Sequence, residues 1–250
     1  MSKQKDHNLI TPYQDQSSKK EQVAKMFDTI SENYDGMNRV ISFGTDIAWR
    51  KKVLKTVQDL QPETILDIAT GTGDLAILMA NSSAKKIIGL DISAGMLEVG
   101  KKKIAQKQLS NKIEMVLGDS ENIPFADNYF DAVTVAFGIR NFEHLEKGLS
   151  EILRVLKPNG KLVILETSVP EKFPFKQGYH LYTNYILPNL GRLFSKDKTA
   201  YAYLSESAKA FPYGEVLNNK LRKIGFLEVQ SFPQTMGVAT IYHASKGSNV

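Results

Sequence analysis

A glycine-rich turn between a short apolar run and a helix-like segment carries the strongest chemical signal in this sequence. It reads Leu66-Asp67-Ile68-Ala69-Thr70-Gly71-Thr72-Gly73-Asp74. Gly71 and Gly73 let the backbone turn tightly and approach a ligand without a Cβ clash. Asp91 closes the next apolar run, where a carboxylate can accept hydrogen bonds from both ribose hydroxyls of an adenosine. The pattern predicts a nucleoside site. We expect it to be formed by Asp91 and by five residues of the glycine-rich turn, namely Asp67, Thr70, Gly71, Thr72 and Gly73.

Two nucleosides fit this pattern, because Gly71-x-Gly73-x-x-Ala76 also satisfies the dinucleotide fingerprint. A dinucleotide places its pyrophosphate on the helix N-terminus, where free N–H groups and a partial positive charge favour an anion. Asp67 and Asp74 put carboxylates at that place. S-adenosylmethionine has no phosphate and brings a sulfonium and an ammonium, which suit carboxylate neighbours. The charges therefore favour S-adenosylmethionine over NAD, although Asp74 could also simply cap its helix.

A third apolar run ends at Gly118-Asp119-Ser120, close to Ile123 and Phe125. In open α/β sheets, ligands bind outside the carboxyl ends of the strands. We therefore expect Asp119 to accept a hydrogen bond from the adenine amine, beside Ser120. Ile92, Ile123 or Phe125 would then pack on the faces of the adenine ring.

Short runs rich in β-branched residues alternate with helical patterns through the middle of the chain, which is typical of a parallel sheet covered by helices on both faces. We expect an α/β fold with a doubly wound, mostly parallel, Rossmann-like sheet of seven strands. Helical periodicity precedes it, and an aromatic-rich helical insert follows the fifth strand. The expected strands are 64–69, 86–90, 113–117, 130–136, 161–165, 226–232 and 238–244, and the expected helices include 19–30, 46–57, 145–156 and 214–224.

Composition excludes several other classes of protein. The 250 residues are 42% hydrophobic and 24% charged, as in ordinary globular proteins and unlike disordered chains. Cysteine is absent, so the chain has no disulfide, no thiolate metal site and no cysteine nucleophile, and we expect no bound metal. No apolar run is long enough for a membrane span, and the polar start does not resemble a signal peptide.

One catalytic domain is expected after a mobile tail at 1–18. Its parts are an N-terminal helical lid (19–60), a nucleoside-binding core (61–168), a helical substrate insert (169–212) and a C-terminal helix with strands (213–244), within a domain spanning 19–250. The net charge of +5 is mild. The basic groups at 50–52 and 101–103 are interpreted as solvated helix faces, so we expect no nucleic-acid partner.

Further motifs lie on either side of the nucleoside loop. Tyr34-Asp35-Gly36-Met37-Asn38 continues through Ser42 to Trp49-Arg50-Lys51-Lys52, and Phe137-Gly138-Ile139-Arg140-Asn141 follows the fourth expected strand. With 154–160 and Leu165-Glu166-Thr167-Ser168, they resemble the menaquinone and ubiquinone biosynthesis C-methyltransferase family, of the class I S-adenosylmethionine-dependent enzymes. The resemblance extends from about residue 21 to 244. Asn159 departs from it, because the family usually has glycine there; Asn tolerates left-handed φ, so little functional consequence is expected.

The resemblance implies methylation of a ring carbon on a polyprenylated naphthoquinol, the last step of menaquinone synthesis. The alternatives are a benzoquinol of the ubiquinone pathway and, less favoured, an NAD-dependent oxidoreductase. We expect Arg140 to stabilise a phenolate, Asn141 to donate a second hydrogen bond, and His180 to act as a base through water. Tyr34, Asp35 and Asn38 would form a lid over the donor, with Tyr34 contacting it.

A polyprenylated substrate also implies a location and a binding surface. We expect a cytoplasmic protein with peripheral contact at the inner face of the cell membrane, where the isoprenoid tail of the substrate resides. The aromatic insert would supply an apolar groove for that tail. A homodimer is a further expectation.

Overall fold

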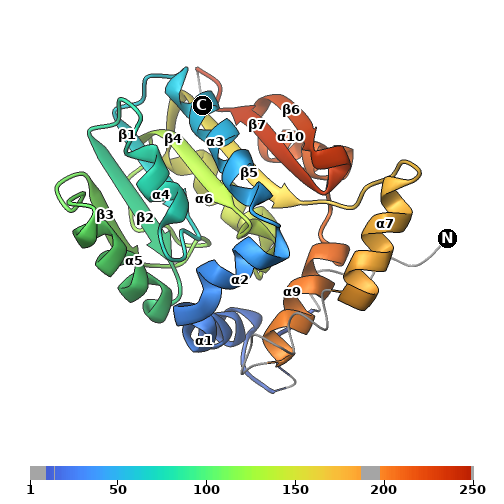
Figure 1. Cartoon of the computed structure of the whole chain (residues 1–250). Coiled ribbons are helices and arrows are strands. Elements are labelled where there is room, and N and C mark those ends of the chain that lie inside the picture. Colours follow the sequence, from blue (N-terminus) through green and yellow to red (C-terminus); the bar gives the residue numbers. More distant parts are fainter. Residues whose placement is uncertain (1–9, 14, 187–197, 249–250) are drawn as a thin grey trace.

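A seven-stranded sheet forms the centre of the computed structural model, which describes residues 10–13, 15–186 and 198–248 (Figure 1). The strand order is β3-β2-β1-β4-β5-β7-β6. Strands β1 to β5 pair in parallel, and β7 is antiparallel to both of its neighbours. The strands are β1 (Thr64–Ile68), β2 (Lys86–Asp91), β3 (Ile113–Leu117), β4 (Phe130–Ala136), β5 (Leu156–Thr167), β6 (Leu227–Gln234) and β7 (Ala239–Ser245). The fold class expected from the sequence is confirmed.

Helices cover both faces of the sheet and its carboxyl-terminal edge (Figure 1). They are α1 (Lys19–Ile30), α2 (Tyr34–Ile41), α3 (Thr45–Gln58), α4 (Asp74–Met79), α5 (Ala94–Gln106), α6 (Leu145–Val155), α7 (Phe175–Leu181), α9 (Lys198–Ala210) and α10 (Glu215–Ile224). Each expected helix and strand named above is present, with small differences at the ends. The largest is in β5, which begins at Leu156, because Leu156 already pairs with Phe130 of β4 ahead of an irregularity in the pairing.

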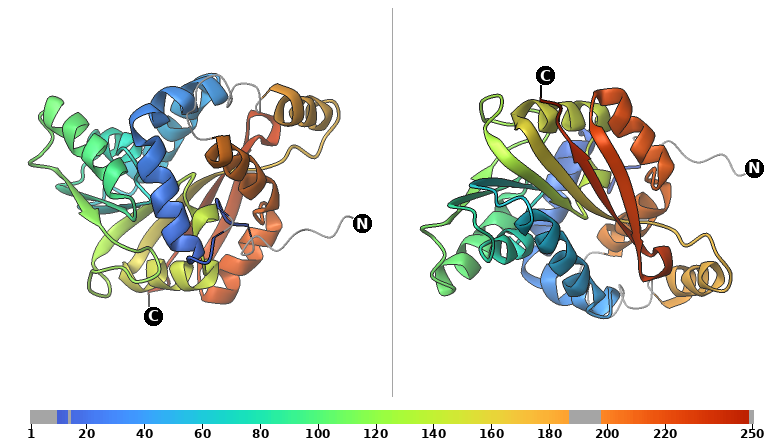
Figure 2. Two further views of the ribbon diagram at one scale, coloured as in Figure 1. Left: turned by 90° about the horizontal axis from the view of Figure 1, so that it is seen from below. Right: turned by 90° about the horizontal axis from the view of Figure 1, so that it is seen from above.

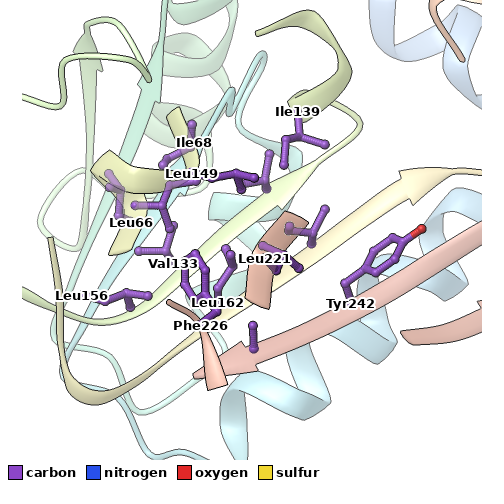
Figure 3. Close-up of a cluster of buried hydrophobic side chains, with 14 of the residues drawn as sticks. Leu66, Ile68, Val133, Ile139, Leu149, Leu156, Leu162, Leu221, Phe226 and Tyr242 are labelled. Atoms are coloured by element: carbon purple, nitrogen blue, oxygen red, sulfur yellow. The ribbon is translucent and has the colours of Figure 1, made fainter. Parts of the chain in front are cut away.

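Alternation along the buried strands divides the interior into two apolar clusters, since successive side chains of a strand point to opposite faces. Ile65 packs in the cluster with α3, α4 and α5. Leu66 and Ile68 pack in the cluster with α6 and α10, together with Val133, Phe226 and Tyr242 (Figure 3). The runs are apolar on both faces because both are covered by helices.

The loops after β1 and β4, the two central strands, touch each other. Ala69, Gly71 and Gly73 have φ values of 51°, 58° and 79°, all in the left-handed region. A Cβ atom on Gly138 would lie 2.3 Å from the Cβ of Ala69, so only glycine fits between the loops. The close approach brings the Phe137–Asn141 segment beside the glycine-rich loop at the edge of the sheet.

The N-terminal helices lie over that edge with α9, as Figure 2 shows from below. Ser18 and Glu21 form a capping box that begins α1, and Asp28 accepts hydrogen bonds from Ser93 and the backbone of Gly95 at the start of α5. An apolar cluster joins α1 and α2 to α9 through side chains including Met26 and Tyr203. The segment between the expected helices 19–30 and 46–57 is itself partly helical, because α2 buries Met37 in this cluster.

Two other expectations can be compared with the backbone. Asn159 has a φ of 63°, the left-handed conformation that Asn tolerates, at the position where the family usually has glycine. Residues 1–9 of the expected tail, and Phe194 of the aromatic insert, lie outside the described residues. Ile10 and Tyr13 pack against the N-terminal helices, so the expected tail is not independent of the fold over its whole length.

Candidate active site

A pocket at the carboxyl ends of β1, β2 and β3 collects most of the expected nucleoside-binding residues; we call it the donor pocket. The strand ends supply Gly71, Asp91, Ile92, Asp119 and Ser120. The loop after β4 closes one side and α1 and α2 close another, and from these segments come Lys20, Val23, Phe27, Tyr34, Phe137, Asn141 and Phe142. The sequence thus identified the floor of this pocket but not the side chains of α1.

Asp91 holds the glycine-rich loop against β2. One carboxylate oxygen accepts a hydrogen bond from the Gly71 backbone at 2.7 Å, and the other accepts one from the Ser93 backbone at 2.9 Å. Burial raises the pKa of Asp91 to about 6. Each oxygen can accept more than one hydrogen bond, so the carboxylate can still bind a ribose.

Asp67 and Thr70 lie deeper, beneath the glycine-rich loop. The Asp67 carboxylate accepts hydrogen bonds from the Thr70 hydroxyl at 2.6 Å and the Thr134 hydroxyl at 2.7 Å, and burial raises its pKa to about 6. Asp67 does not line the donor pocket but a smaller pocket beside it. The two pockets share four lining residues, Tyr34, Ala69, Gly71 and Ala136. We call the smaller one the third pocket.

Asp74 has cationic partners that the sequence argument did not include. Lys103 approaches one of its oxygens at 2.5 Å and Arg39 the other at 2.6 Å. Although burial raises the pKa of Asp74, the hydrogen bond and charge of Lys103 and the charges of Arg50 and Arg39 together outweigh it, so the pKa is lowered. The N-cap of α4 is Gly73, without a side-chain cap, so Asp74 does not cap the helix. Asp74 is thus compensated by two ion pairs, whereas Asp67 has no ion pair with any described residue and is influenced by the charge of nearby Arg50.

Thr72 and Asp119 are both bound to N-terminal segments. The Thr72 hydroxyl donates to Asp35 of α2 at 2.5 Å, and Lys103 donates to the Thr72 oxygen at 3.2 Å. Lys20 of α1 approaches the Asp119 carboxylate at 2.5 Å. These contacts fix α1 and α2 against the strand ends that line the donor pocket.

A larger pocket adjoins the donor pocket where Tyr34 and Phe137 line both. We call it the acceptor pocket. It encloses about 950 Å³, part of it open to solvent. Most of its wall is apolar or aromatic, and its lining includes Ile41, Trp49, Arg50, Phe137, Arg140, Thr167, Tyr179, Tyr182, Leu204 and Val238. Tyr34 lines all three pockets, so its ring lies where they meet.

Arg140 brings a buried guanidinium to the acceptor pocket. It is 6% exposed and donates from Nη1 to the Phe137 carbonyl and the Glu166 carboxylate, both at 2.7 Å. Burial lowers the pKa of Arg140, but the charge of Glu166, the hydrogen bond to Glu166 and the electrostatic effects of Tyr34 and Tyr203 together outweigh this, and the pKa is raised. Asn141 points to the donor pocket, where its side-chain oxygen accepts a hydrogen bond from the Tyr203 hydroxyl at 3.1 Å.

His180 is not brought together with these residues. It is exposed on α7 and lines none of the three pockets, whereas its neighbours Tyr179 and Tyr182 line the acceptor pocket. The interpretation of 50–52 as a solvated helix face is wrong for Arg50, which is 8% exposed and lines the acceptor and third pockets. Its place on the same face of α3 as Trp49 and Val53 could have indicated burial.

The donor pocket fits S-adenosylmethionine on its own chemistry. A buried carboxylate at the end of β2 suits a ribose, and the Asp67 carboxylate in the adjoining third pocket, which has no ion pair with a described residue, suits a cationic donor better than a pyrophosphate. Together with the strand order and the antiparallel β7, these features define a class I S-adenosylmethionine-dependent methyltransferase.

The comparisons with known proteins agree. The model of the ubiE/COQ5 methyltransferase family matches residues 15–246, and the chain belongs to this family. It is 48% identical to "Demethylmenaquinone methyltransferase" of Bacteroides fragilis, over 95% of this chain and 97% of that one. It is 44% identical to "Ubiquinone/menaquinone biosynthesis C-methyltransferase UbiE" of Geotalea daltonii, over 92% and 98%.

Solved structures support the fold. A putative S-adenosylmethionine-dependent methyltransferase of Methanococcus maripaludis superposes with a TM-score of 0.60 at 24% identity, over 92% of this chain and 94% of that one. Family membership makes the protein a methyltransferase with S-adenosylmethionine as its methyl donor. The alternative of an NAD-dependent oxidoreductase receives no support. Among the described helices, none has the length and apolar character to cross a bilayer.

Proposed function

We propose that the protein methylates a ring carbon of a polyprenylated naphthoquinol, converting demethylmenaquinol to menaquinol. The observation that carries this proposal is the acceptor pocket, which is large, lined mainly by apolar and aromatic side chains, next to the donor pocket and supplied with two buried guanidinium groups, those of Arg50 and Arg140. Such a lining suits an aromatic ring with an apolar tail better than a small polar acceptor. The names of the relatives at 43–48% identity support the naphthoquinol.

In this proposal the chain's own residues bind and orient the donor. Asp91 accepts hydrogen bonds from the ribose hydroxyls, and Asp119 accepts one from the adenine amine, with Ile92 and Ser120 beside the base. Gly71 and Gly73 bring the backbone close to the ligand, and Asp67, Thr70 and Thr72 hold the loop in shape. S-adenosylmethionine supplies an electrophilic methyl group.

The acceptor carbon becomes nucleophilic when a neighbouring ring hydroxyl loses its proton. We assign stabilisation of the resulting oxyanion to Arg140, with a second hydrogen bond from the Asn141 amide. Glu166 orients Arg140, and the Tyr203 hydroxyl binds the Asn141 oxygen, which leaves the amide N–H groups for a ligand. A buried cation stabilises a phenolate strongly because few waters screen it.

Tyr34, Asp35 and Asn38 act as a lid in this proposal. Asp35 is bound to Thr72 and to Lys103, so α2 is attached to the glycine-rich loop. Tyr34 separates the donor pocket from the acceptor pocket, and Asn38 lines the latter. Closing these residues over both substrates excludes water and strengthens the electrostatic effect of Arg140.

We further propose that the protein is cytoplasmic and meets the inner face of the cell membrane around the mouth of the acceptor pocket. Eight exposed hydrophobic side chains lie within six positions in sequence of residues that line this pocket, and the centres of the Phe43 and Tyr182 rings are 5.8 Å apart. Lys172 and Lys176 are exposed nearby in sequence and would meet anionic headgroups. The exposed hydrophobic residues are Val40, Phe43, Ile47, Phe173, Phe175, Leu181, Tyr185 and Met236.

Flotation with vesicles that contain anionic lipid tests the membrane contact. The double variant Phe43→Asp with Phe173→Asp should lose most of the vesicle-bound fraction and keep its affinity for S-adenosylmethionine. Leu227→Asp, which changes an exposed side chain at the start of β6, is the matched control. Equal flotation of both variants would contradict the assigned surface.

The substrate is tested by extracting quinones from cells that lack the protein. Accumulation of demethylmenaquinone, reversed by the wild-type gene, is the expected result. Purified protein should then methylate demethylmenaquinol in preference to a benzoquinol of the ubiquinone pathway. The Geotalea daltonii relative, whose name includes both quinones, motivates that second acceptor. A normal menaquinone content in the deletion strain would refute the proposal.

A further inference from the structure

Arg50 is a buried cation that the functions assigned above leave unexplained. It lies on α3 with only 8% of its surface exposed, and its guanidinium is 5.4 Å from the centre of the Phe137 ring. Nη1 donates a short hydrogen bond to Asp46. Nε is buried and has no hydrogen-bond partner in the described part of the chain. A buried N–H group without a partner costs free energy, so a ligand that accepts from it would be stabilised.

The position of Arg50 suggests which ligand. It lines the third pocket together with Asp67, Gly71 and Asp74, and it also lines the acceptor pocket. The third pocket adjoins the donor pocket, because Tyr34, Ala69, Gly71 and Ala136 line both. A group that extends from an adenosine whose ribose is bound by Asp91 would therefore enter the third pocket.

The charges in the third pocket match a zwitterion. Asp74 is paired with Lys103 and Arg39, so its charge is already compensated. Asp46 is paired with both Arg39 and Arg50. Two groups remain. Among the described residues, only hydroxyl groups donate hydrogen bonds to the Asp67 carboxylate, and Nε of Arg50 has no hydrogen-bond partner. An α-amino acid carries a cation and an anion on one carbon, and it suits an uncompensated carboxylate facing a guanidinium.

We propose that Arg50 binds the carboxylate of the methionyl group of the donor. Asp46 holds one side of the guanidinium, and Nε with the neighbouring N–H group offers the planar pair of donors that a carboxylate accepts. The lid helix α3 thereby recognises the end of the donor that lies next to the acceptor pocket. This assignment rests on one part of the proposed function, the identity of the methyl donor. It does not depend on which quinol is the acceptor.

Calorimetry with two ligands tests the assignment independently of methyl transfer. The ligands are S-adenosylmethionine and its decarboxylated analogue, which keeps the adenosine, the sulfonium and the amine. Wild-type protein should bind the analogue at least about tenfold more weakly. Arg50→Gln should weaken binding of S-adenosylmethionine about 30-fold and binding of the analogue less than threefold, because the lost hydrogen bonds involve only the carboxylate.

Arg39→Gln is the matched control, since Arg39 also pairs with Asp46 and Asp74 but lines none of the three pockets. It should change both affinities by less than about threefold. Equal losses of both ligands in Arg50→Gln, or the same selective loss in Arg39→Gln, would overturn the assignment. If Arg50→Gln does not fold, the wild-type comparison decides: equal affinity for the two ligands overturns the assignment as well.

Discussion

The donor and acceptor halves of the site are constructed differently. On the donor side, the polar groups assigned to the nucleoside come from strand ends and loops within residues 67–120, and they are held by hydrogen bonds such as Gly71 to Asp91. On the acceptor side, α2, α3, the loop after β4, α7 and α9 each contribute one or a few side chains, mostly aromatic or apolar. Recognition of the donor's nucleoside is thus local in sequence, whereas acceptor recognition depends on the packing of distant segments.

This difference predicts that single changes on the donor side abolish binding, whereas changes on the acceptor side alter turnover. The largest effect is expected for Asp91→Ala, which should weaken S-adenosylmethionine binding at least about 100-fold, because two hydrogen bonds to a charged group are lost. Asp91→Asn keeps the shape and should lose nearly as much. Calorimetry measures both. Unchanged affinity would remove Asp91 from the site.

Arg140 offers the corresponding change on the acceptor side. Arg140→Lys should lower kcat about 100-fold and change the donor Kd less than threefold, since the guanidinium is assigned to the acceptor oxyanion. The double variant Arg140→Met with Glu166→Gln removes the buried pair together and avoids an unpaired Glu166. It should fold and remain inactive. Restored turnover would show that Arg140 only neutralises Glu166.

The pH dependence of donor binding sharpens the comparison. Burial raises the pKa of Asp91 and that of Asp67 to about 6 in the protein without ligand. Hydrogen bonds from the ribose favour the ionised form of Asp91, so affinity is full above this pH and falls as the pH drops through 6. Calorimetry should show a loss of about tenfold between pH 7 and pH 5. The loss should be smaller in Asp91→Asn, and an equal loss there would assign it to another group.

Tyr203→Phe should have a smaller effect. Removing the hydroxyl that binds the Asn141 oxygen at 3.1 Å should reduce kcat about fivefold, because the amide is no longer fixed in one orientation. Steady-state kinetics with both substrates measures it, and Tyr129→Phe, at a ring 39% exposed, is the control. A change in thermal stability without a change in kcat would make the contact structural only.

The smallest effect is expected for His180→Ala. The side chain is exposed and outside the three pockets, so turnover should change less than about twofold. The assignment of His180 as the base, acting through water, predicts instead a large loss of kcat that is steepest near neutral pH. A pH–rate profile of this variant beside the wild type therefore decides between the two outcomes.

The sequence by itself determined the sheet, the glycine-rich loop and the cluster of Asp91 and Asp119, because each depends on local patterns. Continuous apolar runs require strands buried on both faces, and the ends of parallel strands meet at one edge. The family motifs also indicated Arg140 and Asn141. The expected homodimer stays a prediction.

Only the tertiary structure decided the charge state of the third pocket and the wall of the acceptor pocket. Lys103 compensates Asp74 from α5, Glu166 pairs with Arg140 from β5, and Tyr203 reaches Asn141 from α9. Each pair joins residues that are 26 to 62 positions apart. The burial of Arg50 likewise depends on how α3 packs against the sheet. Local sequence cannot specify such contacts, since they form only when separate elements pack together.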